Sequence, residues 1–81
     1  MRLDKYLKNS RIIKRRTIAK EACDGGRVSV NGKVAKAGTE VEVGDIIEIR
    51  FGDKTFKAEV TNVLEHVTKD SAKEMFTIIQ D

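Results

Sequence analysis

The hydrophobic residues of this sequence change their spacing at one point, the pair Gly25-Gly26. Before this pair, apolar residues recur at intervals of three and four, which is the period of a helix with one buried face. After it, they alternate with polar residues, which is the period of a strand with one buried face. This order predicts an α+β fold in which two N-terminal helices pack on a small antiparallel sheet.

Two short helices are expected before the glycine pair. The first ends near Asn9, and its apolar face consists of Leu3, Tyr6 and Leu7. The second follows a short connection over residues 10–13, and its narrow apolar face consists of Ala19, Ala22 and Cys23, widened by Ile18. Small residues on that face allow close helix packing, and Gly25-Gly26 provide the left-handed conformation that commonly closes a helix.

Three or four antiparallel strands are expected after the helices. Asn31-Gly32 stands between two apolar runs and predicts a two-residue hairpin turn, because both turn residues must accept a positive φ. Further turns are expected at Gly44-Asp45 and Gly52-Asp53. The alternating apolar residues are Val28 and Val30, then Val41, Val43, Ile47, Ile49 and Phe51, then Phe56, Ala58 and Val60.

The C-terminal segment predicts a short helix, capped by Asp70 or Ser71, before a last apolar stretch. The length of 81 residues is that of a single domain, residues 1–81. No window approaches the length of an apolar membrane span, and the N-terminus lacks a secretory h-region, so a cytoplasmic location is expected.

The charge of the chain is divided between its two parts. Residues 1–36 hold eleven Lys and Arg against three acids, a net +8, whereas residues 37–81 hold five against ten, a net −5. Such asymmetry favours a polyanionic partner for the basic part, either nucleic acid or an anionic membrane surface. The other interpretation is a basic face that is simply solvated.

The start of the second helix carries Lys14, Arg15 and Arg16, although a helix N-terminus is already partly positive. Each such cation costs roughly 0.3–1 kcal/mol, and Arg16 also repels Lys20 four residues later. A bound phosphate would relieve both penalties, so the pattern predicts an anion site. Replacing Arg16 by Glu is then expected to leave the melting temperature unchanged or raised. The predicted site extends to Arg2, Lys5 and Lys8 on the first helix and to Arg27, Lys33 and Lys36 near the hairpin.

The sequence does not favour an enzyme. It contains no HExxH motif, no Ser-His-acid order and no Gly-rich phosphate loop, and neither a cofactor nor a metal is expected. Cys23 has no second cysteine and no histidine at ligand spacing, so it is interpreted as a small core residue. Tyr6 is interpreted as core rather than as a base-stacking platform, and His66 as a surface residue.

Several motifs in a fixed order resemble the RNA-binding domain first named for small-subunit ribosomal protein S-four, also called the alpha-L motif. They are RLDKYL, then Arg16 and Ala19, then GRVSVNGK, then Gly44-Asp45. The resemblance covers residues 1–50 and leaves residues 51–81 to complete the sheet. It implies an RNA surface on the two helices and the hairpin, with Arg16 matching the arginine of the family's second helix. The candidate RNA-binding residues are therefore Arg2, Lys5, Lys8, Arg11, Lys14, Arg15, Arg16, Lys20, Arg27, Lys33 and Lys36.

The runs IKRRT and AKEMFTII further resemble small stand-alone bacterial members of this family. That likeness implies a monomer that docks on large-subunit rRNA of 50S subunits retaining peptidyl-tRNA, and that assists RqcH as it adds alanine to a stalled nascent chain. No membrane partner is implied. Three alternatives stay open: a 50S-recycling factor of the heat-shock-protein-fifteen type, the RNA-targeting domain of an RNA-modifying enzyme such as a pseudouridine synthase, and a protein-interaction module that uses its acidic sheet.

Overall fold

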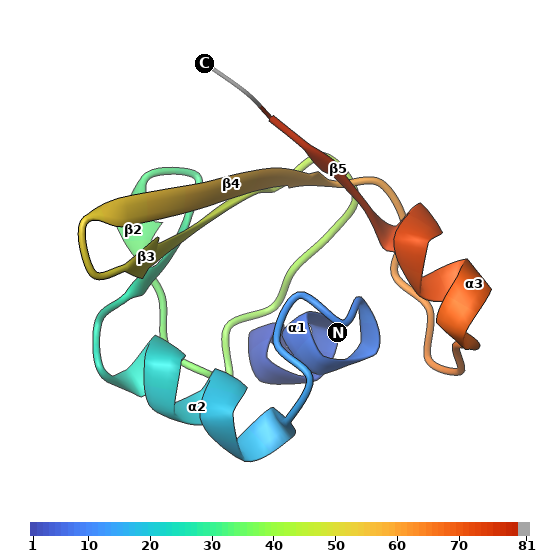
Figure 1. The fold of residues 1–81 in the computed structure, drawn as a ribbon, viewed down its shortest axis with the longest axis horizontal. Helices are drawn as coiled ribbons and strands as arrows, with labels where there is room; N and C mark the ends of the chain where they lie inside the picture. Colours follow the sequence, from blue (N-terminus) through green and yellow to red (C-terminus); the bar gives the residue numbers. More distant parts are fainter. Residues whose placement is uncertain (80–81) are drawn as a thin grey trace.

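The computed structural model describes residues 1–79 and has one sheet with two helices packed against it (Figure 1). In chain order the elements are α1 (Leu3–Asn9), α2 (Arg16–Asp24), β1 (Val28–Val30), β2 (Lys33–Val34), β3 (Ile46–Phe51), β4 (Lys54–Val60), α3 (Lys69–Ala72), the 3₁₀ turn η1 (Lys73–Met75) and β5 (Phe76–Ile78). The strands lie in the order β2-β1-β3-β4-β5, and every neighbouring pair is antiparallel. The predicted α+β class is confirmed.

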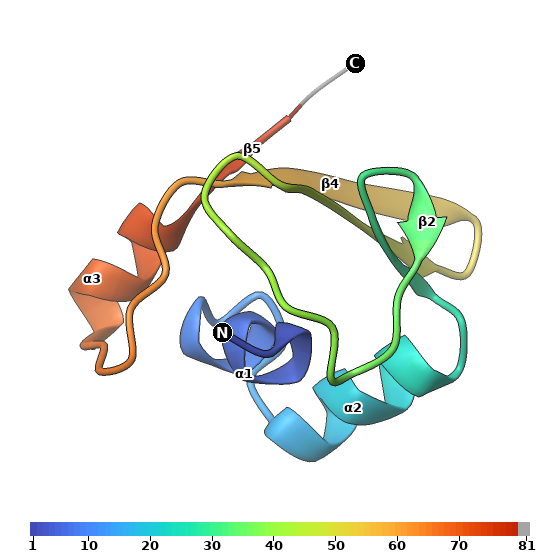
Figure 2. The same cartoon turned by 180° about the vertical axis from the view of Figure 1, so that it is seen from behind.

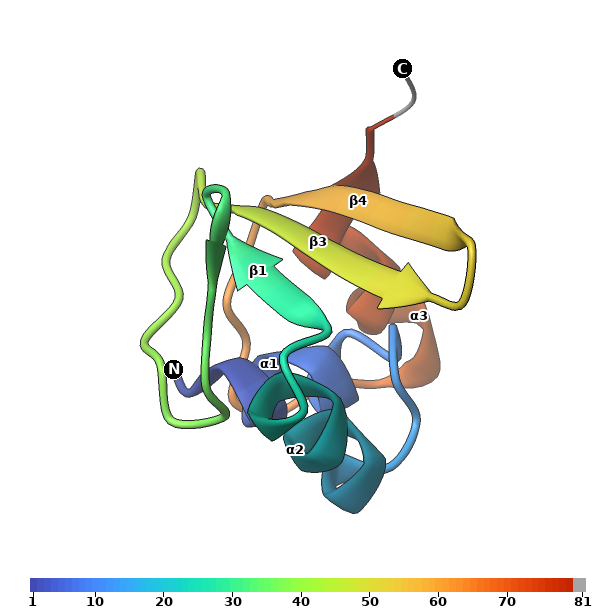
Figure 3. The same cartoon turned by 90° about the vertical axis from the view of Figure 1, so that its left-hand side faces the viewer.

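The core lies between the sheet and the two N-terminal helices, which cover the same face of the sheet (Figure 3). Its buried residues include Leu3, Tyr6, Leu7, Ala19, Ala22 and Cys23 from the helices and Val28, Ile47, Ile49 and Val60 from the strands. The hydroxyl of Tyr6 donates to the carbonyl oxygen of Met75 at 2.6 Å, so its polar end is satisfied inside the core. The core interpretation of Tyr6 and Cys23 is thereby confirmed.

The hairpin turn between β1 and β2 forms where the Asn-Gly pair predicted it. Asn31 and Gly32 have φ values of 52° and 85°, so both turn residues are left-handed. The side chain of Asn31 also accepts a hydrogen bond from the N–H of Ile46 at 2.9 Å and donates to Asp45 at 3.1 Å. These bonds fix the hairpin tip against the start of β3.

The expectation that residues 41–43 continue the strand alternation is wrong. Residues 35–45 form a connection that runs past α1 and the N-terminus (Figure 2). The ends of this connection bond to strands, at Val28 and Val60, but its middle is satisfied by the N-terminus: the N–H of Val41 donates to Met1 and the N–H of Leu3 donates to Thr39. Val41 is buried against the helices, whereas Val43 is 61% exposed. The N-terminus thus takes the place of a sheet partner for the middle of this segment.

Two further apolar residues are less buried than the spacing predicted. Ile18 is 47% exposed and Phe51 is 52% exposed. Phe51 is the last residue of β3, and its partner in the sheet is Lys54, the first residue of β4. The apolar spacing predicted which face of each element is buried, but not at which residue along the element that burial ends.

The C-terminal segment forms the expected short helix and one more strand than expected. The cap of α3 is Thr68, not Asp70 or Ser71: its hydroxyl accepts from the N–H of Ser71, whose hydroxyl accepts in turn from the N–H of Thr68. This reciprocal pair is a capping box. The last apolar stretch pairs with β4 as a fifth strand. Over residues 1–79, no helix is long and apolar enough to cross a membrane.

Candidate nucleic-acid interface

The N-terminus of α2 carries the predicted concentration of positive charge. Arg15 occupies the N-cap position and Arg16 is the first helical residue, and no side chain among the described residues caps this end. The first N–H groups of α2 and its dipole therefore add to the charge of the arginines. Lys14, Arg15 and Lys20 are exposed. The predicted positions of Arg15 and Lys14 beside the helix start are thus observed, whereas Arg16 also bonds within the protein.

Arg16 is held by Asp4, a carboxylate that the sequence analysis did not single out. Asp4 is 2% exposed and accepts hydrogen bonds from Nε of Arg16 at 3.3 Å, from Nε and Nη2 of Arg2 at 3.1 and 3.4 Å, and from the N–H of Lys5 at 2.9 Å. We call Arg2, Asp4 and Arg16 the Asp4 cluster. The signal that could have drawn attention to it is the RLDKYL motif, in which Asp4 stands between the cations Arg2 and Lys5.

The geometry of the cluster explains how a carboxylate can be buried there. Burial alone raises the pKa of Asp4. The hydrogen bonds from the two arginines and from the backbone outweigh that effect, so the pKa of this carboxyl lies below its usual value. Asp4 is therefore ionised at neutral pH, and two guanidinium groups share one negative charge.

The two arginines keep donors that do not bond Asp4, because only Nε of Arg16 and only Nε and Nη2 of Arg2 do. Their side chains are about half exposed, 50% for Arg2 and 49% for Arg16. Arg2 also lies close to Gly38, where an added Cβ would stand 3.9 Å from its guanidinium. The planar guanidinium group of each arginine is a fork of N–H donors. It can hold the carboxylate on one side and present N–H groups to a phosphate on the other, as in bidentate recognition. The cluster has a net charge of +1 and faces solvent.

Two predicted cations are tied to groups of the protein itself. The amine of Lys5 forms an ion pair with Glu65, in the segment that follows β4. The amine of Lys36 donates to the carbonyl oxygen of Asp24 at 3.3 Å, at the C-terminal end of α2. The carboxylate of Glu65 offsets the charge of Lys5, so this residue is a weaker candidate for phosphate binding than the sequence predicted.

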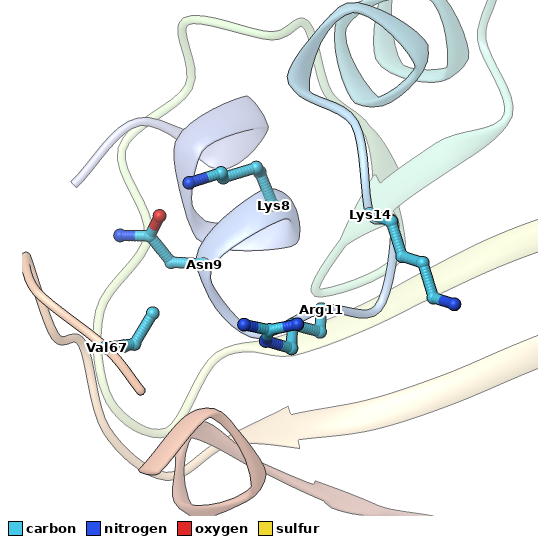
Figure 4. A pocket seen from close by; sticks show the side chains of 5 residues that line it. All are labelled: Lys8, Asn9, Arg11, Lys14 and Val67. Atoms are coloured by element: carbon cyan, nitrogen blue, oxygen red, sulfur yellow. The ribbon is translucent and has the colours of Figure 1, made fainter. Parts of the chain in front are cut away.

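Three other predicted cations surround a hollow of about 230 Å³ at the end of α1 (Figure 4). Lys8 comes from the helix, Arg11 and Lys14 come from the α1–α2 connection, and Val67 closes the hollow from the C-terminal segment. Arg11 lies between the two lysines in Figure 4, and Lys14 points away from Lys8. Arg11 also adopts a φ of 63°, a conformation that non-glycine residues seldom take. The three cationic groups therefore line the hollow without converging on one point.

The remaining predicted cations lie at the other end of α2. Arg27 and Lys33 are exposed, before β1 and at the start of β2. The nine residues of α2 separate them from Arg15 by roughly 13 Å of helix. The eleven predicted residues thus occupy several neighbouring patches around α1 and α2 and do not converge on one point.

The groups that could support other chemistry do not form a site. Burial raises the pKa of Cys23 to about 11, so its thiol stays protonated and unreactive. His66 is exposed. Among the described residues, no group of three His, Cys, Asp or Glu side chains is placed to hold a metal ion.

Known proteins are similar to this chain in both sequence and fold. The S4 domain family matches residues 1–47. The RQC P-site tRNA stabilizing factor of Halalkalibacterium halodurans is 58% identical over 78 residues, covering 96% of this chain and 89% of that protein, and its namesake from Listeria monocytogenes is 54% identical over 81 residues, covering 100% and 88%. The trimeric structure of Vibrio cholerae heat shock protein 15 superposes with a TM-score of 0.88 at 29% identity, covering 98% of this chain and 81% of that one.

Proposed function

This chain belongs to the S4 domain family and to the group of RQC P-site tRNA stabilizing factors, and on that premise we propose how it acts in ribosome quality control. It is a binding protein, not an enzyme, and it docks in the cytoplasm on large-subunit rRNA of 50S subunits that retain peptidyl-tRNA. There it contacts the tRNA and assists RqcH as alanine is added to the stalled nascent chain. It consists of a single domain and acts as a monomer.

The Asp4 cluster is the observation that carries this proposal. Two half-exposed guanidinium groups are fixed beside the uncapped N-terminus of α2, with Arg15 next to them. Fixed forks of this kind suit phosphate oxygens, and backbone N–H groups at a helix start add further donors. The other predicted cations extend the surface on both sides. Phosphate contacts of this number give sequence-independent affinity for folded RNA.

Sedimentation through a sucrose gradient tests the proposal directly. We expect the purified protein to co-migrate with 50S subunits and to dissociate steeply with salt. For each tenfold rise in salt concentration, the affinity should fall by roughly 0.7–0.9 log units per phosphate neutralised. Charge reversal at Arg15 is expected to abolish co-migration. Charge reversal at Arg50, Lys54 and Lys57, which lie on β3 and β4, is the control and is expected to leave co-migration largely intact. A flat salt dependence, or equal losses in the two variants, would contradict the proposed RNA face.

A 50S-recycling factor of the heat-shock-protein-fifteen type is a second candidate, and the TM-score of 0.88 favours it. The two roles share the same docking surface and differ in the outcome for the nascent chain. Alanine addition by RqcH on purified obstructed 50S subunits, with and without this protein, separates them. Stimulated tailing supports the first role, and subunit release without tailing supports the second.

A further inference from the structure

A second hollow, of about 450 Å³, lies between the α1–α2 connection and the C-terminal elements. Its exposed cations are Arg11, Lys14, Lys69 and Lys73, and its apolar floor is the half-buried Phe76, beside Ala72, which is only 1% exposed. Arg11 and Lys14 also line the hollow shown in Figure 4, so the two hollows are neighbours. We call this second hollow the linker groove.

The rim of the linker groove is positive although half of it comes from the net acidic part of the chain. Lys69 and Lys73 lie on α3 and η1, and the acids beside them in sequence, Asp70 and Glu74, do not line the groove. Four cations and no carboxylate therefore surround it. Such a rim complements an anionic occupant.

The floor restricts the class of that occupant. Phe76 is half-buried and is held in place by an edge-on contact with Phe56, with ring centroids 6.1 Å apart and planes at 66°. A bare phosphate gains nothing from an apolar floor, whereas a nucleobase can lie on an aromatic or apolar surface while its flanking phosphates meet the cations. A base inside a duplex is stacked on its neighbours and cannot reach such a floor. The groove thus fits an unpaired nucleotide.

We propose that the linker groove binds an unpaired stretch of RNA, with one base on Phe76 and the flanking phosphates at Arg11, Lys14, Lys69 and Lys73. The inference rests on the proposed RNA-binding function and extends it beyond residues 1–47, the part of the chain that the S4 domain covers. It gives the C-terminal segment a binding role in addition to completing the sheet.

Fluorescence anisotropy with a labelled single-stranded oligouridylate and with a labelled RNA duplex tests the proposal. The double variant Lys69→Glu/Lys73→Glu is expected to bind the single strand roughly tenfold or more weakly, because two phosphate contacts are lost. The matched control Arg50→Glu/Lys54→Glu makes the same change in net charge on the β3–β4 end and is expected to lose less than about threefold. Duplex affinity should fall equally and only slightly in both variants, and both should melt like the wild type.

The variant Phe76→Leu examines the floor separately. Leucine keeps an apolar side chain at this position but removes the ring face, so single-strand affinity is expected to fall at least about fivefold while the salt slope stays unchanged. Its melting temperature, measured on the same preparation, shows that the folded protein is being compared. Wild-type affinity in the folded variant would overturn the placement of a base on Phe76.

Other outcomes would overturn the proposal as a whole. Equal losses in the groove variant and the control would mean that net charge alone attracts the strand. A poly-glutamate probe that depends on the groove cations more strongly than oligouridylate does would identify an acidic protein segment as the occupant. If the wild type does not co-migrate with 50S subunits but still binds oligouridylate through the groove cations, the ribosomal function is refuted and the RNA-binding role of the groove is supported. Normal 50S binding with oligouridylate binding indifferent to the groove would refute only the groove.

Discussion

The cations of the Asp4 cluster and those of the linker groove face solvent on the same molecule but are held in different ways. Arg2 and Arg16 share the buried carboxylate of Asp4, and each hydrogen bond fixes the direction of a guanidinium. Lys69 and Lys73 extend from exposed positions on α3 and η1. The first pair is oriented by the folded protein itself, whereas no hydrogen bond or ion pair among the described residues fixes the side chains of the second pair.

This difference changes what a substitution does. Immobilising a long side chain on binding costs roughly 0.5–1.5 kcal/mol, and a fixed guanidinium has already lost that freedom during folding. In return, the Asp4 cluster has become part of the fold, because removing a member leaves a buried or crowded charge without a partner. Changes in the cluster should affect folding and binding together, whereas changes at the groove rim should affect binding alone.

The largest effect is expected for Asp4→Ala. The two arginines lose their shared acceptor, and the N–H of Lys5 loses its side-chain partner. We expect unfolding to become easier by about 2 kcal/mol, which corresponds to a melting temperature lower by on the order of 10 °C for a domain of this size. Binding to 50S subunits should also be lost. Thermal denaturation and co-sedimentation of one preparation measure both, and an unchanged melting temperature would show that Asp4 does not organise the arginines.

A paired comparison at the start of α2 separates the two roles of its arginines. Arg16→Glu places a second carboxylate beside Asp4, so we expect destabilisation of roughly 1–2 kcal/mol, contrary to the dipole argument from the sequence. Arg15→Glu places the same charge at the exposed N-cap, where the dipole favours it, so its melting temperature should be unchanged or higher. Both variants should bind 50S subunits poorly. Equal melting temperatures for the two would mean that the bond between Arg16 and Asp4 contributes nothing.

A smaller effect is expected from acid. Because the pKa of Asp4 is depressed in the folded protein, its contribution to stability is complete above its unfolded value near 3.8 and is lost as the pH falls through the lower folded value. The stability difference between wild type and Asp4→Asn should therefore be constant between pH 7 and about 5 and should shrink below about 4. Thermal denaturation across this range measures it, and a difference that stays constant into strong acid would contradict the depressed pKa.

The sequence predicted those parts of the molecule that depend on local spacing. The two helices, the Asn31-Gly32 turn and the strands after Gly44 follow from apolar periodicity and turn chemistry, which act over a few residues. The path of the middle of residues 35–45 could not be predicted in this way, because its partners include Met1 and Leu3, which are distant in sequence. Local patterning does not specify which distant backbone will satisfy an extended segment.

The site shows the same division. The density of cations near α2 was evident from the sequence, and so was the incompatibility of Arg16 with the helix dipole. The compensation that the structure provides, Asp4, lies twelve residues earlier in the chain on another helix. The linker groove was missed for a related reason: Lys69 and Lys73 belong to the part with a net charge of −5, and only folding places them beside Arg11 and Lys14. Charge counted along a chain does not give charge arranged in space.

The most direct test of the proposed role of Arg16 keeps the charge of the Asp4 cluster and changes only the shape of the cationic group. Lysine at position 16 retains the positive charge but has a single ammonium group, which cannot hold Asp4 and a phosphate in the fixed geometry of a guanidinium. The affinity for 50S subunits of Arg16→Lys should therefore fall roughly tenfold, while Arg15→Lys, with no carboxylate to hold, should stay within about twofold of the wild type. Equal affinities for the two lysine variants, measured on folded protein at one salt concentration, would contradict the account, because charge alone would then suffice.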